Sequence, residues 1–145
     1  MKTWILVADE GRARLFAGER LDGELLEVAG FAHPAAHHPE SEAQDRLPRV
    51  QESVGSARHA IQPRTSAEDK QADAFARALG EVLEDGRVQA RYERLILVAA
   101  PRFLGRLRSA LDPQVARLVS HSADMDISKA GLDEIRRELQ DLLAS

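Results

Sequence analysis

The fold is decided by the stretch Thr3-Trp4-Ile5-Leu6-Val7-Ala8-Asp9-Glu10-Gly11-Arg12-Ala13-Arg14-Leu15-Phe16, taken together with Leu95-Ile96-Leu97-Val98-Ala99-Ala100-Pro101-Arg102-Phe103-Leu104-Gly105. The first stretch predicts a strand, a tight turn and an alternating second strand. The second predicts a buried strand that runs straight into a helix, with Pro101 in the first helical turn. Strands joined by a tight turn are antiparallel, whereas parallel strands need a crossover. One sheet should therefore begin as a meander and continue as βα units, which excludes the dinucleotide-binding fold that opens with a Gly-rich βα turn.

The rest of the chain predicts further elements of the same sheet and its covering helices. We expect strands at 24–32, 95–100 and 119–123, and helices at 66–86, from 101, at 115–118 and at about 133–143. Ser66 is the expected N-cap of the first helix, and Gly86 is its expected end. Gly11 in the first turn can adopt a positive φ at no steric cost. In the last helix, Leu132 and Ile135 are expected among the buried residues.

Between His33 and Thr65 the periodic apolar pattern breaks down, and prolines and histidines become frequent. A structureless stretch of this length is unusual inside a compact domain. Short runs at 49–53 and 57–61, on either side of Gly55, can form a hairpin. We therefore expect a single domain over residues 1–145, with a long, mobile loop or a hairpin insertion at 33–65.

Composition excludes several classes of protein. The net charge of −4 gives no global attraction to nucleic acid or to anionic membranes. The absence of cysteine excludes disulfides, thiolate catalysis and cysteine zinc sites. No apolar run approaches the ~20 residues that span a bilayer, and the short apolar start before Asp9 does not resemble a signal peptide. We expect a cytoplasmic protein with no membrane span.

Several motifs in order resemble one bacterial family. Trp4-Ile5-Leu6-Val7-Ala8-Asp9 with Gly11-Arg12-Ala13-Arg14-Leu15-Phe16, and Leu97 through Arg108, look like the host attachment proteins, described as required for attachment to host cells. Phe75-Ala76-Arg77-Ala78-Leu79 and Asp124-Met125-Asp126-Ile127-Ser128 fit the same family. The resemblance covers nearly the whole chain. That family is similar in fold to the middle domain of the archaeal and eukaryotic class-one release factor.

The resemblance implies an α/β fold of ribonuclease-H-like or release-factor middle-domain type. Its mixed five-stranded sheet would run β-β-β meander, long loop, then α-β-α-β-α, with helices packed on the sheet. In release factors, the loop or hairpin after the meander carries Gly-Gly-Gln and promotes hydrolysis of peptidyl-tRNA. The segment 33–65 occupies the equivalent place but contains no Gly-Gly-Gln, and Gln44, Gln51 and Gln62 lack adjacent glycines. No catalytic residue is carried over.

Five arginines form the predicted binding patch. Arg102, Arg106 and Arg108 follow the carboxyl end of the 95–100 strand, where ligands of α/β sheets commonly bind. With Arg12 and Arg14 they are predicted to form a patch for RNA phosphate or a nucleotide. The alternative is an exposed helix face whose arginine stems cover apolar surface.

The long loop is predicted to add contacts through Arg49, Arg58, His59 and Gln62. Its basic residues are matched by acidic ones, which favours a solvated loop over a strong phosphate-binding arm.

The sequence offers two candidate metal sites, but neither is predicted to bind a metal. The loop holds four histidines without the spacing of a structural site: His33, His37, His38 and His59. Asp9, with Glu10, Asp124 and Asp126 as companions, resembles a nuclease carboxylate set, but Asp9-Glu10-Gly11 is more simply a turn. No cofactor is predicted.

The sequence therefore favours a non-catalytic binding domain that contacts the ribosome or structured RNA. One alternative is a divergent peptidyl-tRNA or ester hydrolase that uses a loop glutamine such as Gln62. Another is a protein-interaction module in attachment or stress physiology, which would have a protein partner in place of RNA.

Overall fold

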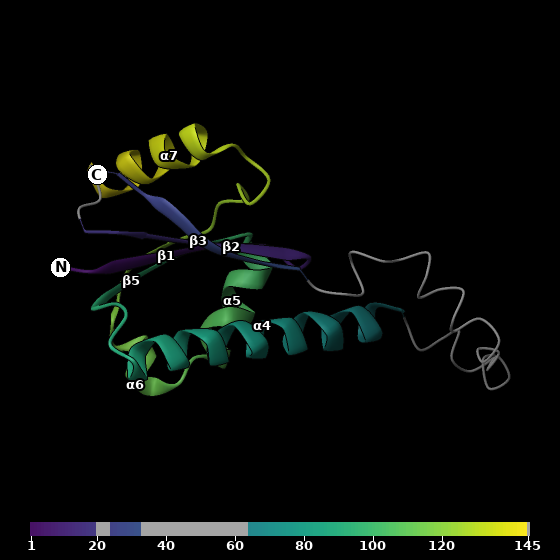
Figure 1. Ribbon diagram of the computed structural model, residues 1–145. Coiled ribbons are helices and arrows are strands. Elements are labelled where there is room, and N and C mark those ends of the chain that lie inside the picture. Colours follow the sequence, from purple (N-terminus) through teal and green to yellow (C-terminus); the bar gives the residue numbers. More distant parts are fainter. Residues whose placement is uncertain (20–23, 33–63, 145) are drawn as a thin grey trace, which may run out of the picture.

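The computed structural model describes residues 1–19, 24–32 and 64–144. These residues form one sheet with the strand order β3-β2-β1-β5-β6 and helices on both of its faces (Figure 1). The strands are β1 (Thr3–Ala8), β2 (Arg12–Gly18), β3 (Leu26–Ala32), β5 (Arg94–Ala99) and β6 (Val119–Ala123). The helices are α4 (Arg64–Val88), α5 (Pro101–Ala110), α6 (Pro113–Ala116) and α7 (Leu132–Ala144).

Strand directions follow the expected topology. β1 pairs antiparallel with β2, and β2 pairs antiparallel with β3. On its other side β1 pairs parallel with β5, and β5 pairs parallel with β6. The predicted α/β class, with a meander followed by crossovers in one mixed five-stranded sheet, is confirmed.

The predicted loop at 33–65 falls mostly on residues 33–63, which lie outside the described residues. α4 begins at Arg64. Thr65 and Ser66 are therefore already helical, and the prediction of Ser66 as N-cap was wrong. Within the described residues, no helix is both long and apolar enough to cross a membrane.

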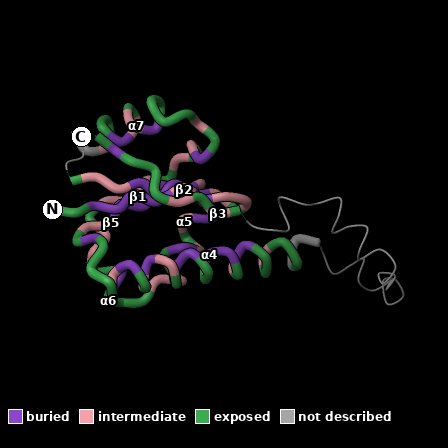
Figure 2. The backbone as a smooth tube through the Cα atoms, viewed as in Figure 1, coloured by how far each residue is buried: buried purple, intermediate pink, exposed green. Residues whose placement is uncertain are grey.

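The central strand β1 is buried along its whole length and divides two cores (Figure 2). Because side chains alternate across a strand, Trp4 and Leu6 face the layer of α4, α5 and α6, whereas Ile5 and Val7 face α7. The same alternation places Leu15 of β2 in the first core and its neighbour Phe16 in the second. Burial on both faces explains the continuous apolar run of β1.

Gly86 does not end its helix, contrary to the prediction. α4 continues to Val88, and Gly86 lies against the rings of Trp4 and Tyr92. A Cβ on Gly86 would come within 2.5 Å of Trp4 Cη2 and within 3.2 Å of Tyr92 Cε1. The two rings stack with their centroids 4.7 Å apart. The glycine is required by this close approach of the helix to β1, not by a turn.

Ala90 provides the left-handed residue that ends α4. Its φ is 58°, and its N–H donates to the carbonyl of Arg87. The next N–H, of Arg91, donates to the carbonyl of Gly86. These two bonds form a Schellman motif, in which glycine is the usual left-handed residue.

Two smaller details differ from what the sequence allows or predicts. No described glycine has a positive φ, so Gly11 does not use its conformational freedom in the first turn. Leu132, expected in the core, is 36% exposed because it is the first residue of α7, while Ile135 and Leu139 one and two turns later are buried.

Candidate functional site

A cleft of about 720 Å³ lies at the carboxyl ends of β1 and β5. One wall is the turn that follows β1, and another is the start of α5 directly after β5. The segment between β6 and α7 completes it. Parallel strands place their carboxyl ends at the same edge of a sheet, where ligands of α/β proteins commonly bind. Three acidic and three basic residues line the cleft: Asp9, Glu10, Asp126, Arg12, Arg102 and Lys129.

Asp9 uses its whole carboxylate to hold the cleft together. Its Oδ1 accepts hydrogen bonds from the N–H groups of Gly11 at 2.8 Å and Arg12 at 2.9 Å. Its Oδ2 accepts a 2.6 Å bond from the hydroxyl of Ser128, a residue that is 1% exposed. Asp9 thus fixes both the turn after β1 and the far wall. In the part of the chain that the structure describes, no three His, Cys, Asp or Glu residues are placed to hold a metal ion.

Arg14 belongs to the same framework and does not line the cleft. Its guanidinium makes two hydrogen bonds to Glu27 of β3, at 2.9 and 3.0 Å, and lies 5.2 Å from the ring centre of Phe16. These bonds lower the pKa of Glu27 and raise that of Arg14. A third bond, 2.6 Å long, reaches the carbonyl of Ala130 and ties β2 to the segment before α7.

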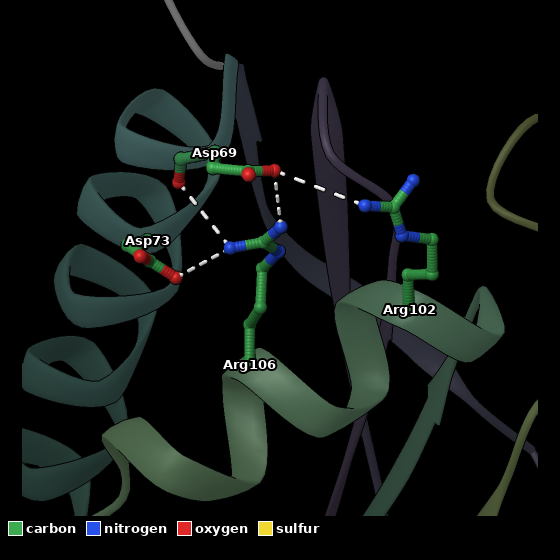
Figure 3. Close-up of polar contacts among 4 residues, drawn as sticks. All are labelled: Asp69, Asp73, Arg102 and Arg106. Atoms are coloured by element: carbon green, nitrogen blue, oxygen red, sulfur yellow. Dashed lines mark hydrogen bonds and ion pairs between the residues drawn. The ribbon is translucent and has the colours of Figure 1, made fainter. Parts of the chain in front are cut away.

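Arg106 is held between α5 and α4 (Figure 3). Its Nη1 lies 2.7 Å from Asp73 Oδ1, and its Nη2 lies 2.7 Å from Asp69 Oδ1. The hydrogen bond to Asp73 is the largest of the effects that raise the pKa of Arg106. Only 18% of the Arg106 side chain is exposed. This arginine therefore joins two helices.

Arg102 and Arg108 have different surroundings, although both lie on α5. Arg102 lines the cleft with 74% of its side chain exposed, and its Nη2 lies 3.8 Å from Asp69 Oδ1. Arg108 does not line the cleft and donates to the hydroxyl of Ser122 in β6 at 3.0 Å.

The structure thus brings together two of the five arginines predicted as a patch, Arg12 and Arg102, and adds Lys129, which the sequence analysis missed. Lys129 follows the quoted motif ending at Ser128, but only the contact of Ser128 with Asp9 brings it to this edge. The predicted loop contacts lie outside the described residues: Arg49, Arg58, His59 and Gln62.

Comparison with known proteins agrees with the expected family and fold. Residues 4–139 match the family model described as "Protein required for attachment to host cells". No curated protein matches the chain. Among solved structures, the crystal structure of the archaeal translation termination factor aRF1 is similar with a TM-score of 0.54 and 8% sequence identity. The match covers 99% of this chain but 39% of that one, so the chain corresponds to a part of the factor. At 8% sequence identity, this similarity shows a shared fold and nothing further about function.

Proposed function

Because the chain belongs to the family of proteins required for attachment to host cells, we propose that it is a non-catalytic member that binds structured RNA, free or on the ribosome. The contact surface is the cleft at the carboxyl ends of β1 and β5. The observation that carries the proposal is the convergence of Arg12, Arg102 and Lys129 on this cleft.

Apart from Asp9, three basic and two acidic residues line the cleft, which favours phosphate over a cation. Three hydrogen-bond donors already satisfy Asp9. Arg102 and Lys129 are exposed, so both can reach a ligand without first losing buried contacts. Glu10 and Asp126 remain at the border and oppose an anion. We therefore expect modest affinity that falls steeply with salt, because phosphate binding releases counterions.

Two further observations support this reading. Part of an archaeal translation termination factor shares this fold, which supports ribosomal RNA as a partner class for the domain. The 145-residue sequence has no Gly-Gly-Gln, which supports a binding role over peptidyl-tRNA hydrolysis.

Binding is tested by titrating the protein into a fluorescently labelled, structured RNA at several salt concentrations. With three basic contacts, the slope of log Kobs against log salt should be roughly −2 to −3. Arg102→Ala and Lys129→Ala should each weaken binding and reduce the slope by about 1.

Arg117→Ala is the matched control, since it removes an exposed arginine at the opposite end of the sheet. Its neighbour Leu118 accepts a hydrogen bond from the N–H of Leu95, at the start of β5. Equal losses in the Arg117 and Arg102 variants would show that net charge alone matters, and would refute the cleft as the contact surface.

Sedimentation through a ribosome gradient places the contact in its physiological setting. The protein should travel with ribosomal fractions at low salt and leave them at high salt. Absence from every such fraction, with recovery of one defined protein partner, would favour the interaction-module alternative. Release of labelled peptide from peptidyl-tRNA, lost in Gln62→Ala, would contradict the non-catalytic part of the proposal.

A further inference from the structure

Two arginines of α5 share one carboxylate oxygen of α4. Asp69 Oδ1 lies 2.7 Å from Nη2 of Arg106 and 3.8 Å from Nη2 of Arg102 (Figure 3). Arg102 and Arg106 are four residues apart, so they lie one turn from each other on the same side of the helix. Asp69 therefore contacts both Arg106, which joins the two helices, and Arg102, which lines the cleft.

The two arginines depend on Asp69 to different degrees. Arg106 also bonds Asp73 at 2.7 Å and the backbone carbonyl of Asp69 at 3.3 Å. For Arg102, the ion pair with Asp69 is the one contact that the described residues provide for its guanidinium. That contact is longer than a direct hydrogen bond, and the side chain is mostly exposed. Arg102 is thus restrained but can exchange partners.

Arg106 in turn prevents Asp69 from moving with Arg102. The 2.7 Å contact is short, and Arg106, whose side chain is 18% exposed, holds the Asp69 carboxylate, whose side chain is 42% exposed. The carboxylate is therefore a fixed negative charge beside the cleft, drawing Arg102 toward α4 in the free protein. A phosphate that enters the cleft has to take Arg102 from this competitor.

We propose that Asp69 sets the affinity of the cleft for RNA phosphate by competing for Arg102. The inference rests on the proposed function and adds a positioning residue that acts through Arg102 without touching the ligand. Removing the carboxylate should strengthen binding, the opposite of what loss of a framework contact would do.

Asp69→Asn is the primary variant, because it keeps the shape and removes the charge. We expect RNA affinity to rise by about 2- to 5-fold, the range that corresponds to an exposed ion pair. Asp73→Asn is the matched control: it removes the same charge from the same helix and the same partner, Arg106, but Asp73 has no described contact with Arg102. Its effect on affinity should be smaller than that of Asp69→Asn.

Thermal melting separates binding from folding. Each variant leaves Arg106 with one carboxylate, so both should lose a similar, small amount of stability. If Asp69→Asn folds poorly, Asp69→Ala serves as a second test, with the same expected gain in affinity.

A double-mutant cycle identifies the route of the effect. In an Arg102→Ala background, Asp69→Asn should no longer raise RNA affinity, whereas in a Lys129→Ala background the rise should persist. A rise that survives in the Arg102→Ala background would come from net charge and would overturn the inference.

The failure of this inference can be told from failure of the proposed function. If the wild-type protein shows no salt-dependent RNA binding, both are overturned. If the wild type binds and Arg102→Ala weakens binding, yet Asp69→Asn and Asp73→Asn give the same affinity, only the competition by Asp69 is overturned.

Discussion

Gly86→Ala is expected to destabilise the fold although it improves helix propensity. The new Cβ would lie 2.5 Å from both Cη2 and Cζ3 of Trp4 and 3.2 Å from Tyr92 Cε1. Ordinary carbon contacts are about 3.5–4.0 Å, so the indole or the helix has to move by about 1 Å. The Trp4 ring has little room to move, because Tyr92 stacks on it and β1 is the central strand of the sheet.

The magnitude follows from two opposing effects. Overpacking of a core costs about 1–3 kcal/mol. Replacing glycine in a helix by alanine stabilises the helix by about 0.5–1 kcal/mol. The net loss should be about 1–2 kcal/mol, which lowers Tm by roughly 3–6 °C in a chain of this size.

Gly105→Ala is the matched control in α5. A Cβ at Gly105 meets nothing within 4 Å, so only the gain in helix propensity should appear, with a small rise in Tm. Both variants are melted under identical conditions by circular dichroism. Trp4 is the only tryptophan in the chain, so its fluorescence should report the displaced ring in Gly86→Ala and stay unchanged in Gly105→Ala. A Tm for Gly86→Ala equal to or above that of Gly105→Ala would refute the close approach.

Three further predictions concern the framework around the sheet. Ala90→Gly should stabilise the protein by about 1 kcal/mol, seen as a higher urea midpoint, because glycine accepts the positive φ that ends α4. Burial raises the pKa of Tyr92 from 10.0 to about 12. The neutral side chain therefore stabilises the fold fully below pH 10, and this stabilisation is lost as pH rises toward 12. The free energy of unfolding, obtained from urea titrations across this range, should fall with pH by up to about 3 kcal/mol, and Tyr92→Phe should flatten the fall at the cost of the hydrogen bond to the Leu83 carbonyl. Ser128→Ala should cost about 2 kcal/mol in urea unfolding, because it removes a 2.6 Å hydrogen bond to the Asp9 carboxylate; an unchanged midpoint would contradict that contact.

The sequence predicts those features whose cause is local. β1 lies directly before the predicted turn at Asp9-Glu10-Gly11, and the helix opened by Pro101 begins at that residue. Asp112 is the N-cap of α6, as its position before Pro113 indicates, and accepts a hydrogen bond from the N–H of Gln114. Each signal lies within a few residues of its effect.

Features that depend on distant contacts were not predictable. The local pattern predicts that Gly86 ends its helix. The glycine is instead required by its contact with Trp4, 82 positions earlier in the chain. Arg106 was grouped with Arg102 because both follow the same strand. Nothing near Arg106 in sequence indicates that Asp69 and Asp73, more than 30 residues away, neutralise it.

The packing of α4 on α5 explains why arginines of one helix differ in role. At one end of the pair, a Cβ on Gly80 would lie 2.8 Å from the carbonyl oxygen of Ala110, so the backbones are in close contact there. At the other end, the long side chain of Arg106 connects the helices through Asp69 and Asp73 (Figure 3).

Arg106 is therefore a poor probe of the cleft. Its removal would break two ion pairs and leave Arg102 as the one ion-pair partner of Asp69 among the residues that the structure describes. The freed carboxylate would hold Arg102 more strongly, so RNA binding should weaken in Arg106→Ala even though Arg106 touches no ligand. Asp69→Asn in that background should restore binding, which a direct phosphate contact by Arg106 would not allow.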